Sequence, residues 1–239
     1  MKVAAINGSS RMEKGYTDIL ARPFLQGMRE AGAEVELFYA KRLMIKPCTG
    51  EFHCWDEKPG ECYQHDEMQT LYPKLREANI LVLAVPVYIP LPGVMQNLIN
   101  RLCPLLEPIL EIRDGRTRAR LRSNVQIQRI VLVSTGGWWE IGNFNTLVGI
   151  AAELAETMGI EFSGALLRPH AYLMIRKGEL TKKGEEILDA ARKAGQALVR
   201  HGKIPEDLST SVSRPLISSD AFVKLWNRRY GAMNDQTDT

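Results

Sequence analysis

The sequence predicts an α/β fold, in which helices pack on both faces of a parallel β-sheet. Short apolar runs alternate five times along the chain with longer segments of helical periodicity. One of these runs, residues 80–85, is almost wholly apolar, as expected for a central strand that is covered on both faces. Gly or Pro ends most of the segments.

Five strands are expected. The first is the apolar run Val-Ala-Ala-Ile, and the second alternates polar and apolar residues. Pro86 ends the third, the fourth leads into Gly136 and Gly137, and the fifth begins after Gly159. The expected strands span residues 3–6, 34–39, 80–85, 130–134 and 160–167.

A helix is expected after each strand. Gly32 ends the first helix, and Asp66 can cap the second. Pro92 occupies the first turn of the third, Gly159 ends the fourth, and Thr181 caps the last. The expected helices span residues 17–31, 66–78, 92–106, 145–158 and 181–201.

Five such units favour the strand order 2-1-3-4-5, with ligands bound at the carboxyl ends of strands one, three and four. Residues 1–202 are expected to form this domain, with an insertion rich in Cys, Gly and Pro at residues 42–65. Residues 203–239 form an extension that we expect to pack on the domain or on a sister subunit.

The composition indicates a globular protein, with 45% hydrophobic and 25% charged residues. A net charge of +3 gives no reason to expect a nucleic-acid or membrane partner. The chain enters its first expected strand directly, so no signal peptide is expected. Four cysteines are too few for a disulfide scaffold in 239 residues and indicate a reducing compartment, so we expect a cytoplasmic location.

The loop after the first strand has the composition of a phosphate site. Ser9, Ser10 and Arg11 lead to Thr17 at the start of a helix. Loop amides, hydroxyls and the helix N-terminus favour an anion there, and Arg11 adds a full positive charge. The loop matches neither the nucleoside-triphosphate motif nor the dinucleotide motif. An ordinary turn with a hydroxyl cap is the alternative.

Two further loops follow strands three and four. Residues 86–93 contain three prolines and Tyr88, so this loop is stiff and offers a flat ring with a hydroxyl. Residues 134–137 are small and leave their amides free, so a flat ligand can approach the backbone closely. Trp138 and Trp139 could cover an aromatic ring or meet a neighbouring subunit.

A phosphate loop, a stiff loop and a glycine loop at one sheet edge suit flavin mononucleotide (FMN). No side chain needs to act as a catalytic acid or base, because the flavin supplies the redox chemistry. The candidate FMN-binding residues are Ser9, Ser10, Arg11, Tyr16, Thr17, Pro86, Val87, Tyr88, Ile89, Ser134, Thr135, Gly136 and Gly137.

Four motifs in order resemble the NADPH-dependent FMN reductase family, and especially its iron–sulfur flavoprotein branch. They are residues 6–17, 45–50, 86–101 and 135–137. The resemblance covers about residues 1 to 200 and implies a flavodoxin-like fold, bound FMN, and a homodimer or homotetramer. It also implies that the cysteine segment of one subunit lies near the flavin of a neighbour.

The cysteine segment departs from the pattern of the cluster-bearing members of this family. Those members have Cys-x-x-Cys-x-x-Cys followed by a fourth Cys, whereas here the second position is Glu51. Cys48, Cys54 and Cys62 remain as candidate metal ligands, and an iron–sulfur cluster normally takes four thiolates. The fourth ligand would be absent, or would be Glu51, His53 or a group from outside.

Three interpretations of this segment stay open. It could hold an iron–sulfur cluster on three cysteines, it could be a vestigial segment that now forms part of the flavin pocket or dimer interface, or it could bind zinc with His53. Cys103 lies in the third expected helix and is interpreted as a small buried hydrophobic residue.

The arginines at 113, 116, 118, 120 and 122 could meet the extra phosphate of NADPH, although a solvated loop is the more ordinary interpretation. The expected function is that of an FMN-dependent oxidoreductase, which passes electrons from NAD(P)H through FMN to a small-molecule or protein acceptor. One alternative is an iron–sulfur flavoprotein-type electron carrier that is fed by ferredoxin and has no nicotinamide activity. Another is a flavin-free binding protein that keeps only the fold.

Overall fold

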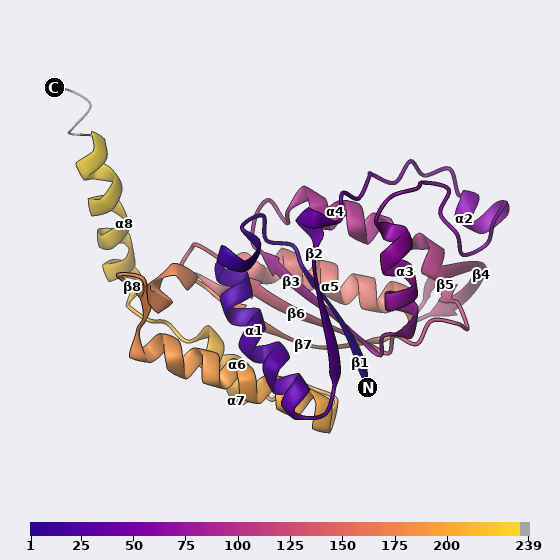
Figure 1. Cartoon of the computed structure of the whole chain (residues 1–239). Helices are drawn as coiled ribbons and strands as arrows, with labels where there is room; N and C mark the ends of the chain where they lie inside the picture. Colours follow the sequence, from indigo (N-terminus) through magenta and orange to yellow (C-terminus); the bar gives the residue numbers. More distant parts are fainter. Residues whose placement is uncertain (235–239) are drawn as a thin grey trace.

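The computed structural model describes residues 1–234 and confirms the α/β prediction. Its central sheet has five parallel strands in the order β2-β1-β3-β6-β7 (Figure 1). This is the predicted order 2-1-3-4-5, because β6 and β7 are the fourth and fifth strands of the sheet and β4 and β5 belong to a separate hairpin. The strands are β1 (Lys2–Asn7), β2 (Glu34–Tyr39), β3 (Ile80–Pro86), β6 (Arg129–Thr135) and β7 (Glu161–Arg168).

Helices cover both faces of the sheet, because alternate residues of each strand point to opposite sides. One face packs against α1 and α6, with Ala5 and Val82 among the strand residues. The other packs against α3, α4 and α5, with Ile6 and Leu83. The bounds of these helices are α1 (Tyr16–Glu30), α3 (Met68–Glu77), α4 (Gly93–Asn100), α5 (Asn145–Met158) and α6 (Lys182–His201).

Helices α1 and α6 approach each other closely, and glycine makes this possible. A Cβ on Gly27 would lie 1.8 Å from the carbonyl oxygen of Arg192, and one on Gly195 would lie 2.0 Å from that of Phe24. Thr181 caps α6 as predicted, since its hydroxyl accepts a hydrogen bond from the Gly184 amide at 3.0 Å.

The third expected helix is shorter than predicted. Helix α4 ends at Asn100, and the chain then turns through Cys103–Leu105 into a β-hairpin made of β4 (Leu106–Arg113) and β5 (Arg116–Leu121). The prediction of a helix to residue 106 and of a solvated loop beyond it was wrong. Pro104 has no N–H to continue the helix. The hairpin strands were missed because most of their residues are exposed, so they lack the alternation of apolar and polar residues that marks a half-buried strand.

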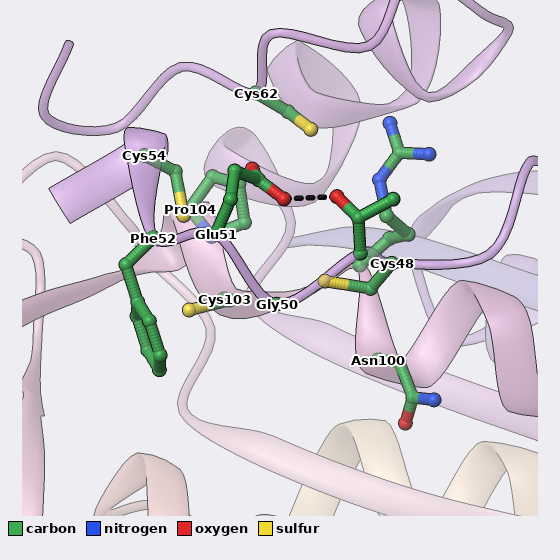
Figure 2. Close-up of a pocket in the computed structure, with 11 residues that line it drawn as sticks. Cys48, Gly50, Glu51, Phe52, Cys54, Cys62, Asn100, Cys103 and Pro104 are labelled. Carbon is green, nitrogen blue, oxygen red and sulfur yellow. Dashed lines mark hydrogen bonds between the residues drawn. The ribbon is translucent and has the colours of Figure 1, made fainter. Parts of the chain in front are cut away.

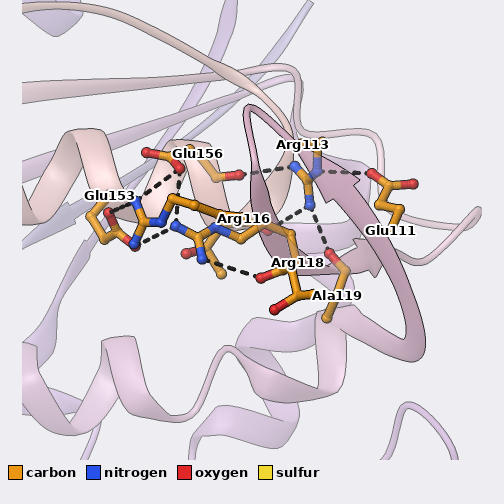
Figure 3. Close-up of polar contacts among 9 residues, drawn as sticks. Glu111, Arg113, Arg116, Arg118, Ala119, Glu153 and Glu156 are labelled. Carbon is orange, nitrogen blue, oxygen red and sulfur yellow. Dashed lines mark hydrogen bonds and ion pairs between the residues drawn. The ribbon is translucent and has the colours of Figure 1, made fainter.

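The hairpin is fixed to α5 by its arginines (Figure 3). Arg116 and Arg118 pair with Glu153 and Glu156 at 2.9 Å. Arg113 donates hydrogen bonds to the carbonyl oxygens of Glu156 and Thr157 at the end of α5. These guanidinium groups therefore stabilise the hairpin, and the solvated loop expected from the sequence does not form.

The C-terminal extension contains α7 (Glu206–Ser213) and α8 (Ser219–Asn234). Helix α7 packs beside α6 and β7, whereas α8 projects away from the sheet (Figure 1). Buried Arg168 donates to the carbonyl oxygens of Val212 and Arg214 and so attaches the extension to β7. Residues 235–239 of the predicted extension lie outside the described residues.

The remaining α-helix and strands are short. They are α2 (His53–Asp56), within the segment 42–65, and the pair β8 (Ile175–Arg176) and β9 (Glu179–Leu180). Among residues 1–234, no helix has both the length and the apolar character needed to span a membrane.

Candidate functional site

A cavity of about 220 Å³ opens at the carboxyl ends of β1, β3 and β6, where the sequence predicted the site. The three predicted loops meet there. Ten predicted residues line the cavity: Ser9, Arg11, Tyr16, Thr17, Pro86, Val87, Tyr88, Thr135, Gly136 and Gly137.

Three predicted residues do not line this cavity. Ser134 is fully buried, and its hydroxyl donates to the carbonyl oxygen of Val85 at 2.6 Å, so it joins β6 to β3. Ile89 is fully exposed. The Ser10 hydroxyl lies 2.9 Å from the Tyr88 hydroxyl and so connects the first loop to the second.

The lining also contains residues that the sequence analysis missed, namely Gly15, Ala171 and Tyr172. Ala171 and Tyr172 follow β7 and begin a short 3-10 turn after His170, whose φ is +39°. The Ala171 amide donates to the Gly136 carbonyl oxygen at 3.0 Å, which holds this turn against the glycine loop. Tyr172 is therefore placed at the cavity by a contact between residues far apart in the sequence, which a local pattern does not reveal.

A buried polar network supports the first loop from below. Asp18 is 1% exposed and accepts hydrogen bonds from the Asn7 side-chain amide at 3.1 Å and from the Tyr39 hydroxyl at 2.7 Å. Asn7 in turn accepts from the Ser9 amide at 2.9 Å. Burial, and then the bond to Asp18, raises the pKa of Tyr39 to about 12, so the phenol stays protonated as a donor. The network holds the Ser9 backbone in place.

Close contacts at the start of α1 complete the loop. A Cβ on Gly15 would lie 2.4 Å from the Ser9 hydroxyl oxygen, so Gly allows the two segments to meet. The amides of Tyr16 and Thr17 begin the helix and have no carbonyl partner inside it. The Thr17 hydroxyl is hydrogen-bonded to the Thr135 hydroxyl at 2.7 Å.

These residues fit a phosphate monoester. Backbone donors at the start of a helix, the Ser9 and Thr17 hydroxyls and the Arg11 guanidinium all border one cavity. Beyond them, Tyr88 and the side-chain-free backbone at Gly136 and Gly137 offer room for a flat ring system. A flavin mononucleotide has both parts, a phosphate monoester and a flat ring system.

Residues 1–138 match the sequence profile of the NADPH-dependent FMN reductase family. The chain belongs to this family. Its cofactor is FMN, and the flavodoxin-like fold predicted from the sequence is confirmed.

Curated relatives point to one branch of this flavoprotein family. An iron–sulfur flavoprotein of Archaeoglobus fulgidus is 33% identical over 102 residues, which are 42% of this chain and 48% of that protein. An iron–sulfur flavoprotein of Methanocaldococcus jannaschii is 36% identical over 88 residues, 37% of this chain and 44% of that protein. The chain therefore spans about half the length of the curated relatives it matches.

A solved structure agrees on the fold. The NAD(P)H:quinone oxidoreductase from Methanothermobacter marburgensis superposes with a TM-score of 0.57 at 17% identity. The superposition covers 84% of this chain and 98% of that chain. At this identity the likeness concerns the fold alone.

A second cavity, of about 400 Å³, lies at the C-terminal end of α4 (Figure 2). All four cysteines of the chain line it, including Cys103. The interpretation of Cys103 as a buried helical residue was wrong, because α4 ends before it and its side chain is partly exposed. Interaction with the Cys103 side chain lowers the pKa of Cys54, and both thiols line this cavity.

The donors in this region do not form a site for a single ion. In residues 1–234, no three His, Cys, Asp or Glu side chains converge closely enough to hold one metal ion. The Nδ1 atom of His53, the candidate zinc ligand, lies 3.0 Å from an oxygen of the Glu57 carboxylate. The cysteines instead surround the cavity, with the Glu51 carboxylate between them in this view (Figure 2).

Proposed function

We propose that the protein is an FMN-dependent oxidoreductase that passes electrons from NAD(P)H to a small-molecule or protein acceptor. The observation that carries the proposal is the meeting of the three loops in one cavity, lined by hydroxyls, a guanidinium and free backbone. Membership of the NADPH-dependent FMN reductase family supports the same donor and cofactor. The solved quinone oxidoreductase of similar fold is compatible with this class of reaction.

In this proposal the residues of the cavity bind and orient the cofactor. Arg11, with the Ser9 and Thr17 hydroxyls, holds the phosphate. Tyr88 and the backbone at Gly136 and Gly137 border the ring, and Tyr172 closes the side next to the turn after β7. Bound FMN would supply the redox chemistry, that is, transfer of a hydride from the nicotinamide and of electrons to the acceptor. No side chain is assigned the role of a catalytic acid or base.

The proposal includes a homodimer or homotetramer. The hairpin carries Ile109, Leu110 and Ile112, which are 48%, 65% and 70% exposed in the single chain. Such neighbouring exposed apolar side chains are typical of an interface between subunits. We further propose that the protein acts in the cytoplasm, because its four cysteines are free thiols.

Anaerobic titration of the purified flavoprotein with NADPH and, separately, NADH tests the proposal. Loss of the flavin absorbance on addition of either nucleotide is the expected result, with recovery when a quinone or oxygen is admitted. A flavin spectrum that neither nucleotide changes would contradict nicotinamide-dependent activity.

The alternative function is that of an electron carrier without nicotinamide activity. The names of the curated relatives and the cavity lined by four cysteines favour it. Reduced ferredoxin, added under the same anaerobic conditions, separates the two functions. Bleaching with reduced ferredoxin alone supports the carrier, and bleaching with a nicotinamide supports the reductase.

A further inference from the structure

Cys103 reaches the cysteine cavity from a part of the chain that the cluster motif does not include. Cys48, Cys54 and Cys62 lie within residues 42–65, whereas Cys103 follows α4 and starts the turn into the β4–β5 hairpin. The two segments are held together, because the Arg122 guanidinium donates to the carbonyl oxygens of Pro104 and Cys54. The Trp55 indole also donates to the Cys103 carbonyl oxygen at 3.3 Å.

The cavity therefore has four thiols although the motif has three. At the position where the cluster-bearing pattern has its second Cys, Glu51 offers a carboxylate. That carboxylate accepts a hydrogen bond from the Thr49 hydroxyl, and Glu51 is exposed to solvent. Iron–sulfur clusters select soft thiolate ligands over carboxylates. Cys103 is thus the better donor for the fourth position.

The lining of the cavity includes a buried guanidinium with one free donor. Arg101 lines the cavity and is 1% exposed, and two of its nitrogens are paired with Asp66 at 2.8 and 3.2 Å. In the part of the chain that the structure describes, its buried Nε has no hydrogen-bond partner. A cluster with thiolate ligands is anionic, and hydrogen bonds to its sulfur atoms stabilise it. Arg101 is suited to donate such a bond.

We propose that Cys103 is the fourth ligand of an iron–sulfur cluster that Cys48, Cys54 and Cys62 also bind. Each thiol loses its proton when it binds iron. The arrangement suits a cluster better than a single ion, because in a cluster each ligand binds a separate iron and the ligands stand apart around it. This inference goes beyond the proposed oxidoreductase function and does not depend on the identity of the electron donor.

Anaerobic incubation of the full-length flavoprotein with ferrous iron and sulfide, followed by gel filtration, tests it. The wild type is expected to retain equal amounts of iron and acid-labile sulfide, about four of each per chain. Retention of iron without sulfide, or of neither, would overturn the proposal. Because the measurement is of composition, its result is independent of reductase activity.

Two variants locate the fourth ligand. Cys103→Ser is expected to retain about three irons per chain or fewer, with a changed electron paramagnetic resonance spectrum. Glu51→Gln, the matched control in the same cavity, is expected to match the wild type. The proposal fails if Cys103→Ser keeps the full iron content, or if Glu51→Gln loses it. Equal FMN content in all three proteins shows that the fold is retained.

Alkylation provides a measurement that needs no variant. With both preparations in the same native buffer, iodoacetamide is expected to modify Cys103 in the iron-free protein, where its side chain is partly exposed, and to leave it unmodified in the reconstituted protein. Modification of Cys103 to the same extent in both preparations, measured by mass spectrometry under identical conditions, would contradict its role as a ligand.

Discussion

Arg11 supplies the only full positive charge among the described residues that line the cavity proposed to bind FMN. Its guanidinium carbon lies 5.9 Å from the centre of the Tyr16 ring, which holds the side chain near the helix start. Thr17 contributes a hydroxyl that is already fixed by Thr135. In the proposed site, Arg11 would contribute a charged contact to the phosphate and Thr17 a neutral one.

Replacing both residues, Arg11→Ala with Thr17→Ala, is expected to weaken FMN binding by about a hundredfold or more, since hydrogen bonds to charged groups contribute about 1.5–3 kcal/mol each. The measurement is the flavin absorbance that remains after dialysis. Lys14→Ala removes a positive charge from the same loop, outside the cavity lining, and serves as the control. A full flavin complement in the double variant would disprove the assignment.

At the residue scale, the sequence predicted which residues line the cavity where a local pattern decides their position. Ser9, Arg11 and Thr17 follow directly from a strand, a loop and a helix start. Ser134 was misplaced because it is still part of β6, which extends to Thr135, and its side chain points into the sheet. Cys103 was misplaced because the prediction extended the helix past Pro104, which has no N–H to continue it, whereas α4 ends at Asn100.

At the element scale, the hydrogen bonds that attach the C-terminal extension to the end of β7 depend on a neutral histidine. His170 is fully buried, and its Nε2 accepts from the Leu216 amide at 3.1 Å and lies 3.0 Å from the Arg168 guanidinium. Burial, and then the charge of Arg168, lowers the pKa of His170 to about 4 from its ordinary 6.5. Protonation of His170 would remove the acceptor that holds the extension.

This shift predicts a loss of stability in mild acid. Because the folded-state pKa is below the unfolded-state value, the unfolded chain binds the proton more tightly, and stability falls as the pH decreases from 6.5 to about 4. The slope is about 1.4 kcal/mol per pH unit over that window. Denaturant unfolding between pH 7 and pH 4.5 measures it.

His170→Asn is the matched variant, because Asn tolerates the left-handed backbone and cannot titrate. Its free energy of unfolding is expected to be lower at pH 7 and to change less with pH than that of the wild type. Identical pH slopes in the two proteins would show that His170 does not control the attachment.

The hairpin is one of the elements that the sequence did not predict. Residues 106–121 show little apolar alternation, because β4 and β5 form a separate two-stranded sheet with both faces largely exposed. Its stability comes from contacts with α5, which join residues about 40 positions apart. By contrast, the strands of the main sheet have the apolar runs and alternation from which they were predicted, and β1, β3 and β6 are almost wholly buried.

At the scale of the whole molecule, the exposed apolar side chains of the hairpin predict self-association. Leu110 and Ile112 are two residues apart on one strand, so they lie on the same face. Leu110→Glu with Ile112→Glu is expected to reduce the particle to the monomer mass of 26.9 kDa, measured by light scattering after gel filtration. Leu180→Glu, at another partly exposed apolar position, is the control. A wild type that is already monomeric, or a variant of unchanged mass, would refute this interface.

The gathering of every cysteine into one cavity has a practical consequence for the chemistry of the chain. No thiol exists elsewhere in the 239 residues, so a sulfur-directed dye or spin label can attach only at this place. Exposed Cys48 is the most accessible of the four, whereas Cys54 is 7% exposed. A label on Cys48 would therefore report events at the mouth of this cavity, without background from any other part of the protein.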